Sequence, residues 1–179
     1  RLLVTVSRLA KEKNIDLLLH ALARSPRDLR LVVAGEGPHE EELRGLASDL
    51  RIADRVVFAG AIGRDALPDL YAGAEAFVFG SVTETQGIVI AEALAAGARV
   101  VAADVPQIRE VAGEAARLVP ADADAFAAAF AALGGPPSPL EIERAQAAAA
   151  PFDQGAQARA MEALYEQLTR TYVRYTIVP

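Results

Sequence analysis

The sequence contains no cysteine, no tryptophan and a single methionine, Met161. Without cysteine the chain forms neither disulfides nor thiolate metal sites, and it has no cysteine nucleophile. No apolar run approaches the roughly 18 residues of a membrane span, and no basic-then-apolar leader opens the chain, so we expect a cytoplasmic protein. Membrane association of a longer chain is the alternative. Because the sequence opens inside an apolar run, we interpret it as a piece of a longer protein.

Basic residues are also scarce. The chain carries 18 Lys and Arg against 24 Asp and Glu, a net charge of −6, which argues against a nucleic-acid partner. Only Lys11 and Lys13 are lysines, and both closely follow Arg8. This leaves room for one local basic pocket. With 179 residues, 53% of them apolar, the chain is long enough for one domain with a sizeable core.

Short apolar runs alternate with helical periods along the chain. Ile15, Leu18, Leu19 and Leu22 fall on one helical face, and Asn14 is placed to cap that helix. Gly97 and Asp122 are expected to end and begin later helices. Strands are predicted over residues 2–6, 29–34, 56–59, 76–79, 99–103 and 117–119. This alternation predicts an α/β fold, a Rossmann-like, doubly wound parallel sheet with helices on both faces.

One domain is expected over residues 1–179, with a Rossmann-like core to about residue 134 and helices from about 140 to 179. The segment Gly134–Pro139 is the one linker-like stretch. The last helix carries an apolar stripe at Met161, Leu164, Tyr165, Leu168, Tyr172 and Val173, and the tail Tyr172–Pro179 is also apolar. We therefore expect self-association from about Tyr165 onward. A helix that folds flat onto its own sheet is the alternative.

In such folds ligands bind beyond the carboxyl ends of the strands. Five loops should therefore border one crevice: Ser7–Asn14, Gly35–Pro38, Gly60–Arg64, Gly80–Gly87 and Asp104–Arg109.

The first of these loops is the candidate phosphate site. Arg8 and Lys13 lie just before a helix, whose N-terminal amides attract anions, and together could hold a phosphate or pyrophosphate. The alternative is a solvated loop with ordinary surface charges. Gly35 and Gly37 begin like a dinucleotide fingerprint, but Glu40 replaces its third glycine, which disfavours a nicotinamide-dependent oxidoreductase. We interpret both glycines as tight backbone turns at the crevice edge.

Glu84 and Glu92 are separated by seven residues, with Gly87 between them. Glu92 has only apolar neighbours on its helix, so we expect it to have a partner or ligand there, such as the hydroxyls of a ribose. The two histidines, His20 and His39, have neither metal-ligand spacing nor an evident carboxylate partner, and no catalytic role is expected for them.

At these residues the sequence resembles the C-terminal, sugar-donor-binding domain of retaining GT-B glycosyltransferases of family 4, the glycosyl transferases group 1. The most specific part is Glu84 and Glu92 with seven residues between them, followed by Ala-Leu-Ala-Ala-Gly97. Weaker motifs occur in the expected order: Val6-Ser7-Arg8-Leu9, Lys13-Asn14, Ala34-Gly35-Glu36-Gly37-Pro38, Val57-Phe58-Ala59-Gly60, Phe152 and Leu164-Tyr165.

The resemblance implies a nucleotide-sugar donor as partner and retaining transfer without a metal or other cofactor. Arg8 and Lys13 would neutralise its diphosphate, and Glu92 would bind the ribose. Glu84, with amides near Gly87, would contact the transferred sugar; the catalytic residues implied are Glu84, Arg8 and Lys13. The other donor-binding positions implied are Ser7, Gly35, Gly37, Ile88 and, at the base, Ile62 and Gly63. The acceptor would be held by an N-terminal domain absent from this sequence.

Three departures from the family pattern surround the expected sugar position. Gln86 stands where an aromatic residue is usual, Gly80 where proline is frequent, and Asp104–Gln107 where a glycine pair is expected. They favour the alternative of a non-catalytic nucleotide- or sugar-binding module, or a degenerate transferase domain.

Overall fold

A six-stranded, wholly parallel sheet forms the centre of the molecule. The computed structural model describes residues 1–176, with side chains up to residue 169. The strands are β1 (Leu2–Val6), β2 (Arg30–Ala34), β3 (Val56–Gly60), β4 (Ala76–Phe79), β5 (Val100–Ala103) and β6 (Ala116–Val119), in the order β3-β2-β1-β4-β5-β6. This order confirms the predicted Rossmann-like sheet, with its topological switch between β1 and β4.

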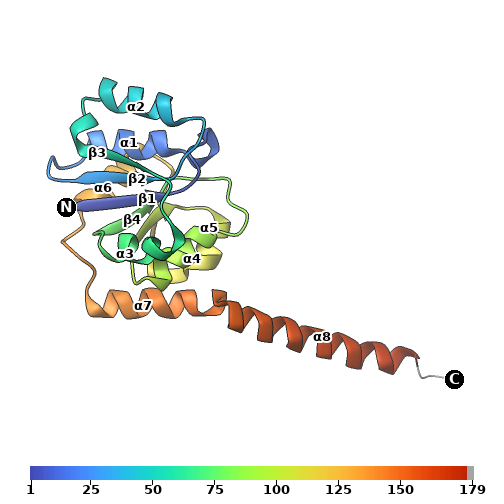
Figure 1. Cartoon of the computed structure of the whole chain (residues 1–179). Coiled ribbons are helices and arrows are strands. Elements are labelled where there is room, and N and C mark those ends of the chain that lie inside the picture. The colour runs from blue at the N-terminus through green and yellow to red at the C-terminus, as the bar shows by residue number, and fades with distance from the viewer. Residues whose placement is uncertain (177–179) are drawn as a thin grey trace.

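Helices cover both faces of the sheet (Figure 1). One face carries α1 (Ile15–Ala23), α2 (Glu40–Asp49) and α6 (Ala123–Ala131), and the other carries α3 (Leu67–Ala72), α4 (Ile88–Ala95), α5 (Pro106–Ala112) and α7 (Pro139–Ala149). Single 3-10 turns lie at Lys11–Lys13, Ala53–Arg55, Arg64–Ala66, Gly113–Ala115 and Ala150–Phe152.

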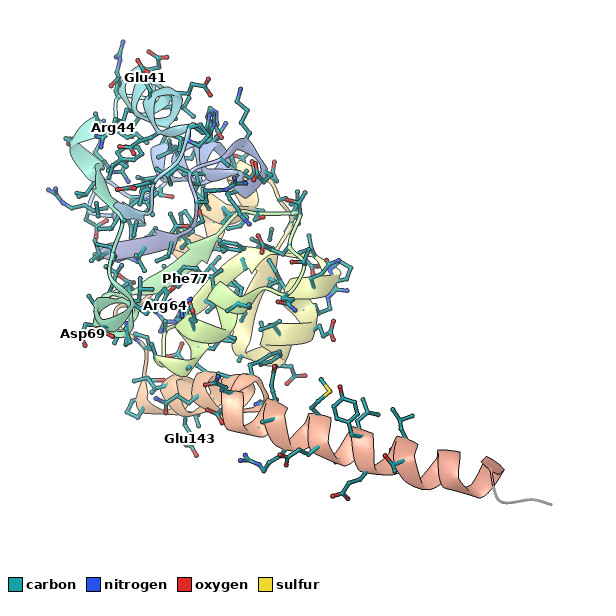
Figure 2. The ribbon with its side chains drawn as sticks, turned by 45° about the vertical axis from the view of Figure 1, so that its right-hand side comes forward. Glu41, Arg44, Arg64, Asp69, Phe77 and Glu143 are labelled. Atoms are coloured by element: carbon teal, nitrogen blue, oxygen red, sulfur yellow. The ribbon has the colours of Figure 1, made fainter. Side chains whose placement is uncertain are left out.

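Two hydrophobic layers, one on each face, hold the sheet to its helices. Strand β4 is buried throughout and sends alternate side chains to the two layers. Phe77 lies inside the domain in Figure 2 and meets the ring of Tyr71 edge-on, with ring centroids 5.3 Å apart. In the opposite layer Phe126 and Phe130 pack in the same way at 5.9 Å. Aromatic pairs in this geometry add to the stabilisation from buried area.

Two of the three predicted helix ends are confirmed. Gly97 has a left-handed φ of +78°, and a Cβ there would come within 2.8 Å of Ile142 on α7. The Asp122 carboxylate accepts hydrogen bonds from the amides of Asp124 and Ala125. Asn14 stands at the N-cap position of α1, as predicted, but the expected capping bond is absent. Its side chain makes no cap, because its Nδ2 instead donates to the carbonyl of Gly80, 3.0 Å away.

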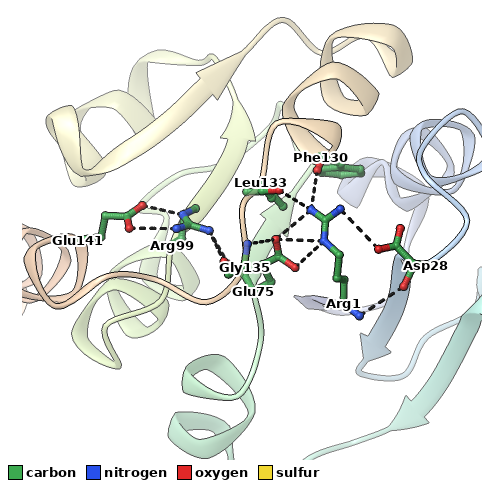
Figure 3. Close-up of polar contacts among 8 residues, drawn as sticks. All are labelled: Arg1, Asp28, Glu75, Arg99, Phe130, Leu133, Gly135 and Glu141. Atoms are coloured by element: carbon green, nitrogen blue, oxygen red, sulfur yellow. Dashed lines mark hydrogen bonds and ion pairs between the residues drawn. The ribbon is translucent and has the colours of Figure 1, made fainter.

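The segment predicted as a linker is tied to the amino-terminal edge of the sheet (Figure 3). Arg1 donates to the buried Glu75 carboxylate at 2.9 Å and to the carbonyl of Leu133 at 2.6 Å. Gly135 donates its amide to Glu75 at 2.8 Å and accepts from Arg99 at the same distance. These bonds fix the start of the crossing to α7.

The last helix, α8 (Gln154–Thr176), projects from the body of the domain (Figure 1). Its main neighbour is the preceding 3-10 turn, so the alternative of a helix lying flat on its own sheet is wrong. Tyr172 and Val173 lie beyond the described side chains, and residues 177–179 of the predicted apolar tail lie outside the described residues. The described part of its apolar stripe is exposed by about half or more: Met161 52%, Leu164 48%, Tyr165 63% and Leu168 55%.

No helix within residues 1–176 is both long enough and apolar enough to cross a lipid bilayer.

Candidate anion-binding site

The loop after β1 and the loop after β4 are joined at the carboxyl edge of the sheet. Besides the bond from Asn14 to Gly80, the hydroxyls of Ser81 and Thr83 both donate to the carbonyl of Glu12, at 3.2 and 3.3 Å. A Cβ on Gly80 would lie 2.8 Å from the Asn14 carbonyl, so the contact requires glycine there. Because β1 and β4 are neighbours in the sheet, the two loops leave it side by side.

Gly35 and Gly37 bring the loop after β2 against the same β1 loop. A Cβ on Gly35 would lie 1.9 Å from the carbonyl oxygen of Ser7, and one on Gly37 would lie 2.2 Å from that of Leu9. Gly35 also has a φ of +129°, which side-chain-bearing residues rarely adopt. The two glycines thus allow a close approach of backbones, as interpreted from the sequence.

A pocket of about 300 Å³ opens between the β1 and β4 loops, and we call it the anion pocket. It brings together six of the residues predicted from the sequence: Ser7, Arg8, Lys13, Glu84, Gly87 and Ile88. Gly35, Gly37, Ile62, Gly63 and Glu92 do not line it.

Each cation of the anion pocket has a carboxylate partner. The Nζ of Lys13 lies 2.7 Å from Oε1 of Glu84, and both side chains are mostly buried, 22% and 11% exposed. Arg8 is far more open, 66% exposed, and pairs with Glu12, four residues on in the same loop. Glu12's own backbone amide and then Arg8 hold the pKa of Glu12 below its usual value. An incoming anion must therefore compete with two carboxylates.

Several hydrogen-bond donors of the same pocket have no acceptor. The hydroxyl oxygen of Ser7 is buried and makes no hydrogen bond with the described residues. Helix α4 begins after Gly87 without a side-chain cap, and its earliest amide with a described backbone bond is that of Ile90. The amides of Ile88 and Val89, which line the pocket, are thus open to a ligand. Uncapped amides at a helix N-terminus attract anions.

Glu92 lies on the exposed side of α4, so its carboxylate is not held in an apolar setting and needs no protein partner there, whereas its binding of a ligand stays a prediction. The sheet, α5 and α7 cover the other sides of α4. Glu92 lies on the side that they leave exposed. It lines a second, larger pocket, whereas Ile62 and Gly63 line neither. Burial first, and the charge of Glu92 second, raise the pKa of the Tyr71 hydroxyl.

His39 does have carboxylate partners, contrary to the expectation from sequence. Its ring is buried, with Nε2 3.0 Å from Asp16 on α1 and Nδ1 against Glu42 on α2. Asp16 is distant in sequence, so no local spacing signalled this contact. The histidine joins two helices away from the anion pocket, and we assign it a structural role.

Comparison with known proteins identifies the family of this chain. The sequence profile of the family described as "Glycosyl transferases group 1" matches residues 1–139. The chain is 37% identical over 112 residues to an alpha-monoglucosyldiacylglycerol synthase of Streptococcus pneumoniae, covering 61% of this chain and 25% of that protein. It is 40% identical over 109 residues to a GDP-mannose-dependent alpha-(1-6)-phosphatidylinositol monomannoside mannosyltransferase of Mycobacterium tuberculosis, covering 55% and 28%.

Among solved structures, Anabaena HepE in complex with UDP superposes with a TM-score of 0.77 at 25% identity, covering 92% of this chain and 48% of HepE. The chain thus spans about a quarter of the length of the curated relatives and about half of this structure. The match over most of its length, in sequence and in fold, shows that the chain belongs to the glycosyl transferases group 1 family.

Proposed function

We propose that this chain is the nucleotide-sugar-binding domain of a retaining glycosyltransferase. The anion pocket holds the donor's diphosphate, and Glu84 contacts the transferred sugar. Glu92 binds the ribose, and the backbone near Ile62 and Gly63 meets the base. The acceptor binds to a further, N-terminal domain, and the isolated chain binds donor without turning it over.

One observation carries this proposal: three different kinds of hydrogen-bond donor line a single small pocket. Arg8 and Lys13 supply charge, the amides of Ile88 and Val89 supply a helix N-terminus, and Ser7 supplies a buried hydroxyl without an acceptor. A nucleoside diphosphate leaves with developing negative charge on its phosphate oxygens. Fixed donors aimed at that charge stabilise it in the transition state, so this arrangement suits departure of a diphosphate.

The relatives support the same reading. The mannosyltransferase named above depends on GDP-mannose, and HepE was solved with UDP. These names differ in the base, so the base bound by this chain is left to experiment. Because the relatives are several times longer than the matched segment, a second domain for the acceptor is the natural complement.

Calorimetric titration of the chain with UDP, GDP, ADP and their neutral sugar derivatives tests the proposal. We expect binding by at least one series, unchanged by EDTA, since no metal is part of the proposal. Lys13→Ala should weaken it, whereas Lys11→Ala should not, because Lys11 is 77% exposed, pairs with Glu42 and lies outside the pocket. No heat with any nucleotide would contradict the proposal.

A non-catalytic binding module is the second candidate, favoured by Gln86 and Asp104–Gln107 at the sugar position. Both candidates bind nucleotide sugar, so they differ only in turnover. A protein that joins this chain to its N-terminal domain should release nucleoside diphosphate in the presence of an acceptor. Donor binding without any such release would favour the module.

The exposed stripe on α8 is proposed as an interaction surface. Its described members, from Met161 to Leu168, are not covered by any other element among the residues that the structure describes. We expect the isolated chain to self-associate through it, since exposed apolar patches drive association. Light scattering should show a concentration-dependent mass for the full chain and a monomer for a version ending at Leu164. A strictly monomeric full chain at high concentration would contradict the proposal.

A further inference from the structure

Asn14 makes a side-chain bond that the proposed function does not use. It stands between the 3-10 turn Lys11–Lys13 and helix α1, and its backbone is left-handed, with φ +54° and ψ +39°. Its amide donates to the carbonyl of Lys11, 3.0 Å away. Asparagine adopts this conformation more readily than most residues. The backbone of Asn14 thus sets the direction in which the chain leaves Lys13.

The Asn14 side chain reaches across to the loop after β4. Its Nδ2 donates to the carbonyl of the buried Gly80 at 3.0 Å. The two backbones are also close, because a Cβ on Gly80 would lie 2.8 Å from the Asn14 carbonyl oxygen. Asparagine at one position and glycine at the other therefore fit each other. We call this pair of residues, with its hydrogen bond, the loop tie.

Two further uncharged bonds join the same loops, and both are weaker. The hydroxyls of Ser81 and Thr83 share one acceptor, the carbonyl of Glu12, at 3.2 and 3.3 Å. These distances exceed the usual range for O–H···O bonds, whereas the 3.0 Å of the loop tie is ordinary for N–H···O. Among the described residues, the loop tie is thus the best-formed uncharged side-chain bond between the two loops.

The loop tie lies beside the ion pair of the anion pocket. Lys13 directly precedes Asn14, and Glu84 follows Gly80 by four residues. Each loop therefore contributes one member to the tie and one to the ion pair, whose charged atoms are 2.7 Å apart. The Lys13 side chain is 22% exposed, so the two loops restrict it. A long side chain that is ordered before binding loses less conformational entropy when the ligand arrives.

We propose that Asn14 is a positioning residue for the donor: its bond to Gly80 holds the two loops together and keeps the Lys13 ammonium in the anion pocket. The inference rests on the proposed function, which assigns that pocket to the diphosphate. Asn14 does not line the pocket, so it acts through Lys13. Gly80, one of the departures from the family pattern, then accompanies Asn14 and is compatible with donor binding.

The main test replaces Asn14 by glycine, which removes the donor and keeps the left-handed backbone accessible. Calorimetry of the full 179-residue Asn14→Gly chain with UDP and GDP should show about fivefold weaker binding, the equivalent of one neutral hydrogen bond. Arg51→Gly is the matched control. Arg51 is the other non-glycine residue with positive φ in the described residues, at +58°, and it is exposed and outside the pocket. Equal affinities of the two variants would overturn the inference.

Salt dependence separates positioning of Lys13 from a general structural role. Nucleotide binding by the unsubstituted chain should weaken as salt is added, because salt screens the attraction between ammonium and phosphate. Asn14 is uncharged, so a merely structural role would leave this dependence unchanged in Asn14→Gly. Displacement of the ammonium should instead make it shallower, and Gly80→Ala should do the same. Weaker binding with an unchanged salt dependence would overturn the inference.

Inorganic pyrophosphate distinguishes failure of the inference from failure of the proposed function. If UDP or GDP binds and Asn14→Gly binds equally well, the inference fails and the proposed function stands. If neither nucleotide binds, pyrophosphate is titrated into the same variants, since it needs only the anion pocket. Pyrophosphate binding that weakens in Asn14→Gly, and not in Arg51→Gly, would support the loop tie without the nucleotide. Pyrophosphate binding that is equal in both variants, or absent, would overturn the inference as well.

Discussion

The amino-terminal and carboxyl-terminal edges of the sheet differ in how completely their charged and polar groups are hydrogen-bonded. At the amino edge, Glu75 is 6% exposed and receives bonds from Arg1 and Gly135, while Arg99 bridges Glu141 and two carbonyls. At the carboxyl edge, Lys13 and Arg8 have one carboxylate each, and Ser7 keeps a buried hydroxyl without a partner. The hydrogen bonds of the amino edge are thus saturated, whereas the carboxyl edge keeps a donor without an acceptor.

This difference separates stability from binding. A saturated buried network loses several bonds when one member is removed, so its residues should control unfolding. A pocket whose hydrogen-bond donors lack acceptors contributes less to stability, but those donors are available to a ligand. Its residues should therefore control ligand affinity. Substitutions at the two edges should therefore move different measurements.

The largest effect is expected from Glu75→Ala. It removes the carboxylate that pairs with the part-buried Arg1 guanidinium and accepts from the Gly135 amide, which should lower the free energy of unfolding by about 3 kcal/mol. Urea unfolding followed by circular dichroism measures it. Glu114→Ala, at an exposed position outside the network, should change the value by less than about 0.5 kcal/mol. A similar small change in both would contradict the view of a saturated edge.

Lys13→Ala comes next and should act on binding. Removing a part-buried ammonium that faces the pocket should weaken nucleoside diphosphate binding about 10- to 100-fold, the equivalent of about 1.5–3 kcal/mol. Arg8→Ala should cost less, under about tenfold, because Arg8 is 66% exposed and water screens it. Calorimetry measures both. If Arg8→Ala weakened nucleotide binding more than Lys13→Ala, the order of effects expected from exposure would be contradicted, and the exposed Arg8 side chain would have to move onto the bound ligand.

Glu84→Gln should have a smaller and opposite effect on the bare nucleotide. The substitution removes the carboxylate 2.7 Å from Lys13, so that lysine becomes free for phosphate and UDP or GDP should bind about threefold more tightly. The corresponding sugar nucleotide should gain less, since it loses its contact with Glu84. Equal gains for nucleotide and sugar nucleotide would contradict the sugar-contact role.

Much of this arrangement could be predicted because it follows from local patterns. Apolar runs marked all six strands, and parallel topology then brought Lys13 and Glu84 to one edge, although they are far apart in sequence. The errors concern side-chain direction. The sequence around Glu92 is apolar on every side of the helix, so it did not show which side the neighbours leave uncovered. Asp16, which contacts His39, and Gly80, which accepts from Asn14, lie on other elements far along the chain, so no local spacing reveals these two contacts.

The smallest effect should come from Glu141 and should appear only in acid. Arg99 first, and the Ser138 cap second, lower the pKa of Glu141 to about 2. An unfolded glutamate has a pKa near 4.3, so the folded state binds its proton less readily. The stabilisation is present above about pH 4.3 and is lost as pH falls toward 2. Because the Glu141 side chain is 42% exposed, screening should hold this contribution below about 1 kcal/mol. Glu141→Gln should therefore reduce the difference between urea midpoints at pH 7 and pH 3, whereas the exposed Glu143→Gln should leave it unchanged. An identical acid response in both variants would show that the amino edge draws no pH-dependent stability from this pair.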